Sequence, residues 1–89
     1  MTTEIPTCTV TGIKDKIKKT DYLYHGLLTI CILTLENGFT VLGESACVSP
    51  LKYNKALGEQ YSYKEAFEKI WLLEGYLLCE KLYREILAA

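Results

Sequence analysis

An alternation of period two marks the middle of the chain and predicts β-strands. Tyr22, Leu23 and Tyr24 alternate ahead of a His-Gly turn, which favours a strand. Residues 27–35, LLTICILTL, follow as a second strand. Apolar residues occupy both of its faces, so the pattern predicts a central strand that is covered on both sides.

The strongest local signal is the dipeptide Asn37-Gly38. Asn-Gly tolerates positive φ at both positions and closes a tight hairpin. The return strand is FTVLGESA (39–46), in which Gly43 indicates a bulge or a close approach of another backbone. The three strands together predict an antiparallel β-meander over residues 20–47.

The period changes to 3.6 after the meander. Ser49 is suited to a helix N-cap and Pro50 to the first helical position. One or two turns follow, and Gly58 either ends this piece or weakens it. A long helix is predicted from about residue 59 to 87, within a helical part that spans 50–87. Its apolar stripe contains Ala66, Phe67, Ile70, Leu73, Leu77 and Leu78.

The amino-terminal end gives weaker signals. Residues 1–8 are polar and contain Pro6, so we expect a loose arm. Ile13 and Ile17 are four apart, as in a short helix, but the same stretch also alternates like a strand; the helix is favoured. The predicted fold is therefore α+β in one domain: a short helix or arm, a three-stranded antiparallel meander, and a long helix packed on the sheet.

The long helix carries more apolar surface than one sheet can cover. IWLLEGYLLC (70–79) leaves almost no polar arc, and soluble monomers rarely expose a contiguous apolar patch of this kind. We therefore predict self-association through this helix, as a homo-oligomer and in the simplest case a dimer. One possible geometry crosses two copies near Gly75, where the missing side chain lets the backbones approach.

Charge argues against nucleic acid as the partner. The formal net charge is −1 and the sequence pI is about 5.8, whereas nucleic-acid binders usually present a basic surface. One short basic run is present, and we interpret it as a solvated face beside two isoleucines. It contains Lys14, Lys16, Lys18 and Lys19.

The cysteines and the start of the chain bear on metal binding and on the cellular compartment. No Cys-x-x-Cys pair is present and the single histidine cannot complete a usual zinc site, so neither a metal nor a cofactor is expected. Cys31 and Cys79 lie in apolar stretches and are interpreted as core residues. The start lacks the pattern of a signal peptide, and the longest apolar run is too short to span a bilayer. We expect a reduced, cytoplasmic protein.

Glu74 is the most unusual residue by its surroundings. It interrupts the apolar stripe, where an unpaired carboxylate would be costly. One hypothesis is contact with a ligand or partner. The other is an internal hydrogen bond, or a pair with Lys81 or a tyrosine.

GESAC (43–47) resembles a catalytic elbow only superficially. The Gly-x-Ser-x-Gly pattern is absent and Ser45 lacks a plausible base, so Glu44 and Ser45 are interpreted as groups that satisfy the backbone at a strand-to-helix joint. An enzyme using Glu44, Glu74 or Cys47 is a weaker alternative. Tyrosines 22, 24 and 53 could frame a pocket for a flat ring. The candidate binding residues are Glu44, Ser45, Tyr53, Trp71, Glu74 and Tyr76.

Two segments carry a resemblance to a known family. GESAC (43–47) and WLLEGYLL (71–78), with the hairpin between residues 37 and 42, resemble a family of small, uncharacterised tailed-phage proteins named for gene product 49 and gene 66 of two podophages. The resemblance covers about residues 21–83. The chain departs from it at residues 51–53, where similar proteins often carry an acidic stretch.

The resemblance implies a non-structural phage protein that works in the host cytoplasm and has no assigned enzymatic role. Small phage proteins of this kind often act by binding. We therefore expect a non-enzymatic accessory protein that binds a host protein stoichiometrically and counters host defence. The alternative is a sponge for a small nucleotide-like signalling ligand, held at a subunit junction.

Overall fold

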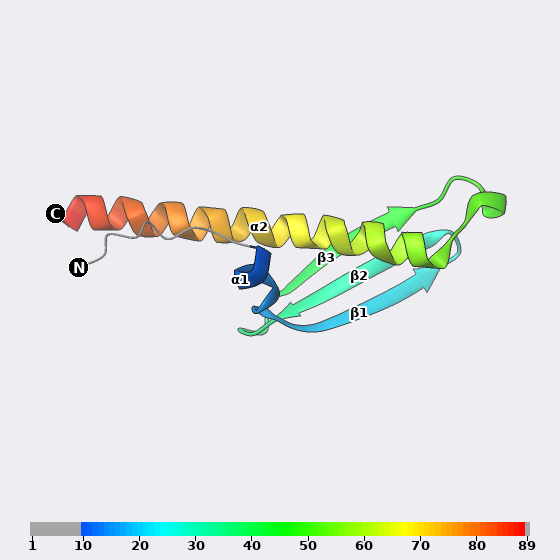
Figure 1. Cartoon of the computed structure of the whole chain (residues 1–89), viewed down its shortest axis with the longest axis horizontal. Helices are drawn as coiled ribbons and strands as arrows, with labels where there is room; N and C mark the ends of the chain where they lie inside the picture. The colour runs from blue at the N-terminus through cyan, green and yellow to red at the C-terminus, as the bar shows by residue number, and fades with distance from the viewer. Residues whose placement is uncertain (1–9, 89) are drawn as a thin grey trace.

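The predicted α+β fold is confirmed in outline. The computed structural model describes residues 10–88, so the predicted loose arm over 1–8 lies outside the described residues. A short helix precedes three antiparallel strands, and a long helix follows them (Figure 1). The elements are α1 (Val10–Lys14), β1 (Ile17–His25), β2 (Leu28–Leu35), β3 (Thr40–Ala46), the 3-10 helix η1 (Pro50–Lys52) and α2 (Lys55–Ala88).

The sheet is a meander in the order β1-β2-β3, with both pairs antiparallel. Its register places Tyr22 opposite Cys31, and Cys31 opposite Gly43. The stretch around Ile13 and Ile17, which fitted two structures, contains both: α1 ends at Lys14, and β1 begins at Ile17.

The β2–β3 hairpin forms where it was predicted, but with a different turn. Among the described residues only glycines have positive φ, and in this turn it is Gly38, at 89°. The Gly38 amide donates to the Leu35 carbonyl (2.9 Å), and the Asn37 side chain accepts from the Phe39 amide (3.0 Å). Asn37 therefore stabilises the loop through its side chain, and a left-handed Gly38 alone turns the chain.

Gly43 allows α2 to lie directly on β3. A Cβ added at this position would lie 2.0 Å from the Ser62 carbonyl oxygen and 2.4 Å from the Ala66 nitrogen. The close approach predicted for Gly43 is therefore confirmed, whereas the alternative of a bulge is wrong because the β2–β3 register is uninterrupted there.

The core lies between α2 and one face of the sheet. Its buried apolar residues come from the helices, β2 and β3: Ile13, Cys31, Leu33, Leu35, Val41, Ala66 and Ile70. The alternate residues of β2, from Leu28 to Thr34, are only half-buried. No described element covers that second face. The prediction that β2 is covered on both sides is therefore wrong for the described residues, because α2 is a single helix that packs on one face.

The long helix begins four residues earlier than predicted. The predicted piece after Pro50 is only η1, for which Ser49 is the N-cap residue without a side-chain hydrogen bond. Asn54 caps α2 instead: its carbonyl accepts from the Gly58 amide (3.0 Å) and its side chain from the Leu57 amide (3.2 Å). Gly58 thus lies inside the helix, where a Cβ would meet Thr29 Oγ1 at 2.6 Å.

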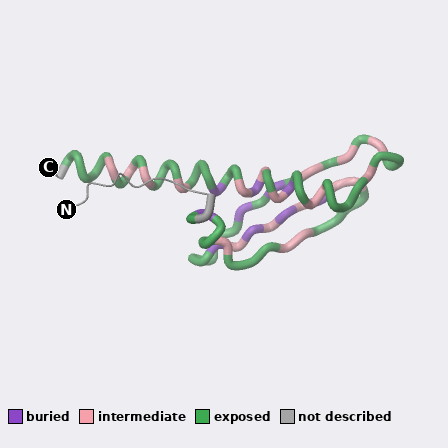
Figure 2. Tube along the Cα trace, viewed as in Figure 1, coloured by how far each residue is buried: buried purple, intermediate pink, exposed green. Residues whose placement is uncertain are grey.

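The helix is longer than the sheet that it covers. Its 34 residues span about 51 Å, whereas the eight residues of β2 span about 27 Å. The carboxy-terminal half of α2 therefore continues past the end of the sheet (Figure 1). Figure 2 shows the buried residues gathered where α2 crosses the strands, and mostly exposed residues beyond.

Candidate functional site

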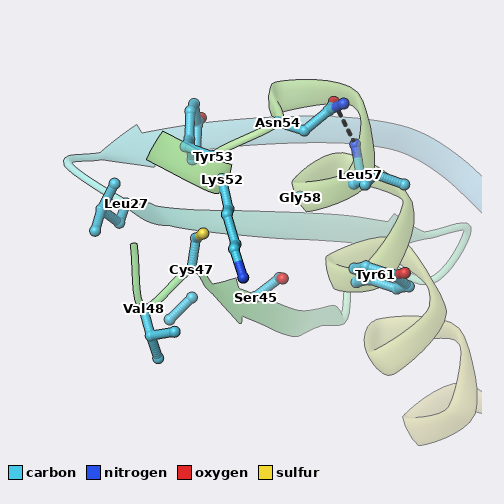
Figure 3. A pocket seen from close by; sticks show the side chains of 11 residues that line it. Leu27, Ser45, Cys47, Val48, Lys52, Tyr53, Asn54, Leu57, Gly58 and Tyr61 are labelled. Carbon is cyan, nitrogen blue, oxygen red and sulfur yellow. Dashed lines mark hydrogen bonds between the residues drawn. The ribbon is translucent and has the colours of Figure 1, made fainter. Parts of the chain in front are cut away.

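A pocket of about 290 Å³ lies at the joint between the sheet and α2 (Figure 3). We call it the joint pocket. It forms where the end of β3, the loop around η1 and the first turns of α2 meet. Its lining residues are Leu27, Ser45, Ala46, Cys47, Val48, Lys52, Tyr53, Asn54, Leu57, Gly58 and Tyr61.

The walls of the joint pocket are largely apolar and include two aromatic rings. In the view of Figure 3, Tyr53 lies at one end and Tyr61 at the other, with Lys52 between them. The Cys47 thiol donates to the Ser49 carbonyl (3.1 Å) and is held within its own loop. Apolar walls with one cation suit a small ligand that combines a flat ring with a negatively charged group.

Two of the six predicted binding residues, Ser45 and Tyr53, come together in this pocket. Glu44 does not, because it alternates with Gly43 and therefore lies on the sheet face away from α2. Tyr22 and Tyr24 belong to β1, at the opposite edge of the sheet, and do not line the pocket.

Sequence reasoning missed Lys52, Leu57 and Tyr61 as lining residues. A usable signal was present, because Lys52 is adjacent to Tyr53 at the predicted joint. Leu57 and Tyr61 are four apart and so share a side of the helix. The prediction that the long helix starts near residue 59 hid this pair, since it placed Leu57 in the separate short piece before Gly58.

Glu74 has an internal partner. Its carboxylate accepts from Lys16 Nζ at 2.6 Å, and its side chain is only 16% exposed. The hypothesis of an internal pair is right in kind, but the cation is Lys16 and neither Lys81 nor a tyrosine. The pair joins the turn between α1 and β1 to α2, and it accounts for the carboxylate without any ligand.

A second concave surface runs beside the edge of the sheet, between β3 and α2. We call it the β3 groove. It has a volume of about 470 Å³ and is shallow. Lys69 bridges its two sides, because its Nζ donates to the Leu42 carbonyl (2.7 Å). The lining residues are Phe39, Thr40, Val41, Leu42, Lys69, Leu72 and Leu73.

Trp71 and Tyr76 lie on the projecting half of α2, by which we mean residues 71–87. Trp71 is 40% exposed and Tyr76 69%. Of the 16 exposed large hydrophobic residues among those described, eight lie on this half. The interpretation of Cys79 as a core residue is wrong, because it is exposed there; Cys31 is buried as predicted. The predicted binding residues are thus spread over several places.

A hydrogen bond raises the pKa of one titratable group near the sheet, and burial raises that of another. The Tyr24 hydroxyl donates to Glu59 Oε1 (2.7 Å), and this hydrogen bond raises the pKa of Tyr24 to about 12. Burial raises the pKa of the Cys31 thiol, so the thiol is protonated at neutral pH and is a poor nucleophile.

Within the described residues, no three His, Cys, Asp or Glu side chains gather closely enough to hold a metal ion. No helix in this part of the chain is both long and apolar enough to cross a membrane.

Two lysines of the basic run form ion pairs. Lys16 pairs with Glu74, and Lys19 pairs with Asp21 at 3.6 Å.

Comparison with known proteins gives one match. The model of a phage protein family, described as the N4 Gp49/phage Sf6 gene 66 family, matches residues 8–82. The match also covers residues 8–20, which lie outside the stretch of about residues 21–83 that carries the resemblance. No curated protein and no solved structure matches the chain.

Proposed function

Because the chain belongs to this phage protein family, we propose that it is an accessory protein that acts by stoichiometric binding in the cytoplasm of the host cell. Its target is a host protein, and the result of binding is to counter host defence. Copies of the chain associate with one another through the projecting half of α2.

The β3 groove is the observation that supports a protein target. Apolar side chains from two segments are exposed to solvent there. Phe39, in the loop before β3, is 56% exposed, and Leu72 of α2 is 72% exposed. The core of a protein–protein interface is apolar and depleted in charge. The β3 groove has the same character, with Lys69 as its one charged lining residue. The groove also runs along an edge strand.

The partner that fits is an extended apolar segment of a host protein. β3 is an outer strand of the sheet, so its outward amides and carbonyls can pair with an added strand. Leu42 is the exception, because Lys69 already donates to its carbonyl. Side chains of the added segment would then fill the groove between Phe39 and Leu73.

The test is capture of a host protein by variants of the groove. Phe39→Asp and Leu73→Asp place a charge in the groove and should abolish capture from host lysate. Leu51→Asp is the matched control, since Leu51 is 97% exposed on η1 and should keep capture intact. The captured protein must then form a complex of defined stoichiometry with the purified chain. Equal capture by all three variants would refute the proposal.

The joint pocket favours a second candidate, a sponge for a small nucleotide-like signalling ligand. Tyr53 and Tyr61 supply aromatic faces for a base, and Lys52 supplies a cation for a phosphate. This role is also non-enzymatic and would likewise blunt a defence that depends on such a signal.

Calorimetric titration with a panel of cyclic mono- and dinucleotides tests the second candidate. Lys52→Ala should weaken binding by about tenfold or more, as expected for the loss of a charged hydrogen bond. Tyr61→Phe keeps the ring and should bind as the original protein does. If no nucleotide in the panel gives a heat of binding, this candidate is refuted, and the proposal of a protein target is unaffected.

A further inference from the structure

The projecting half of α2 carries a second apolar stripe with the spacing of a coiled coil. Its residues recur at intervals of 4, 3, 4 and 3, which is the heptad pattern of core positions. All five are exposed, including Leu72 at 72% and Ile86 at 74%. The stripe consists of Leu72, Tyr76, Cys79, Tyr83 and Ile86.

Beyond Leu72, this stripe turns away from the side of α2 that the sheet covers. Ile70 is fully buried on the side of α2 that faces the strands. Leu72 follows two residues later, about 200° around the helix, where it also lines the outer edge of the β3 groove. Leu77 continues the sheet side of α2 together with Glu74 and Lys81, so that side mixes apolar and charged residues, whereas the stripe opposite contains no charged residue. The protein's own sheet therefore cannot cover the stripe.

The stripe is complementary to itself about Cys79. When two copies run antiparallel with Cys79 at the centre, Leu72 lies level with Ile86 of the other copy, and Tyr76 lies within one residue of Tyr83 along the axis. Aliphatic residues thus meet aliphatic ones, and rings meet rings. Beside the seam, Gly75 lies within one residue of Leu82 of the other copy along the axis, so a large side chain lies near a position where added atoms would meet open space. This symmetry is what a twofold contact between identical chains requires.

We propose that two copies pair as an antiparallel, two-stranded coiled coil over residues 72–86. This proposal deepens the self-association put forward with the proposed function. The two sheets then lie at opposite ends of the pair and on its outer sides. Leu72 lies at the edge of each β3 groove, so both grooves adjoin the pair, and Phe39, Leu42 and Leu73 stay outside its seam.

Charge selects the antiparallel arrangement over the parallel one. The heptad positions that precede Leu72 are Lys69 and Glu65. In a parallel pair each would face its own copy, which places like charges opposite one another. In the antiparallel pair both lie outside the overlap, where Lys69 keeps its contacts with Leu42 and Glu65.

The mass in solution tests the pairing. Light scattering at high micromolar concentration should give twice the 10.1 kDa of one chain. Tyr83→Glu should return the mass to one chain. Leu77→Glu is the matched control, since Leu77 is as exposed as Tyr83 (59% and 56%) but lies off the stripe; its mass should stay doubled. A monomeric original protein, or a Tyr83→Glu variant of unchanged mass, overturns the proposal.

Disulfide cross-linking tests the orientation. In a Cys79→Ala background, Leu72→Cys and Ile86→Cys variants should cross-link when they are mixed, and neither should cross-link through its new cysteine alone. Cross-linking of each variant only with itself would indicate a parallel pair and overturn the antiparallel one. Tyr83→Glu should still capture a host protein through the β3 groove, so failure of the pairing is separable from failure of the proposed function.

Discussion

Gly43 is the residue on which the packing of α2 depends most directly. It lies on the buried face of β3 beneath Ser62 and Ala66, and backbone atoms of α2 occupy the space that any side chain would need. Neither neighbour is a flexible side-chain end that could swing away. The glycine is therefore required by the distance between helix and strand, and not by its own backbone angles.

Substituting Gly43 by alanine should destabilise the fold by about 3 kcal/mol, because the helix must move off the strand. Gly75→Ala is the control, since a Cβ there meets open space and helix propensity should raise stability by about 0.5–1 kcal/mol. Urea unfolding followed by circular dichroism, at a concentration where the chain is monomeric, measures both. Similar stability of the Gly43→Ala variant and the original protein would contradict the close packing.

Tyr24 gives a second prediction about a single residue. Its hydrogen bond to Glu59 raises its pKa to about 12. Since the folded pKa exceeds the ordinary value of about 10, the stabilising effect is present below pH 10 and is lost as the pH rises through 12. Glu59→Gln should lower the pKa toward 10. Carbon-13 NMR titration of the Tyr24 ring, assigned with Tyr24→Phe, measures this change. An identical midpoint in the Glu59→Gln variant would show that the hydrogen bond is not its cause.

At the scale of the element, α2 is one helix with two different environments. Its first half packs on the sheet through Ser62, Ala66 and Ile70, all fully buried. Its second half carries both charged and apolar residues on that side, where Arg84 donates to Glu80 (3.0 Å) and Leu77 is exposed, and it carries a further apolar stripe on the other side. An apolar stripe that the sheet does not face can be covered only by another surface.

The two halves should differ in hydrogen exchange when the chain is monomeric. Amides of residues 60–70 should be protected by packing on the sheet, and those of residues 76–87 should exchange faster because few tertiary contacts hold them. The Tyr83→Glu variant provides the monomer for this measurement. Uniform protection along α2 in that variant would mean that the projecting half is held by contacts within one chain.

At the scale of the whole molecule, the chain is elongated. Its principal extents are 59, 22 and 20 Å and its radius of gyration is 16.9 Å, whereas a compact domain of this length has about 12 Å. The difference comes from the projecting half of α2 (Figure 1). Within residues 10–88, no element covers the second face of the sheet or the outer side of the projecting half.

Small-angle X-ray scattering of the monomeric Tyr83→Glu variant should give a radius of gyration near 17 Å. The projecting half has no described surface to fold back on, because the first half of α2 already occupies its face of the sheet. A value close to 12 Å would indicate that the helix bends back and buries its apolar stripe.

The local period of the sequence was enough to predict the elements and their order. Alternation located the three strands, Gly38 marked the hairpin, and the 3.6 period marked the long helix, because each of these signals depends on backbone geometry close in sequence. The sequence misplaces the start of α2, because a glycine such as Gly58 often marks a helix end. The glycine lies inside the helix because a side chain at this position would collide with Thr29, a residue far away in the sequence.

The candidate site could be predicted only in part. Ser45 and Tyr53 were both named, but their meeting with Lys52 and Tyr61 depends on how the loop after β3 folds over the first turns of α2. The partner of Glu74 was likewise hidden, since Lys16 is 58 residues away.

The strands, the helix and the surplus of apolar residues on that helix follow from periodicity and composition, because these are properties of the chain alone. The folded structure was needed to show which side of α2 the sheet uses and where the helix extends past it. It also decided which acids and lysines pair, because burial and pairing depend on segments that are distant in the sequence and adjacent in space.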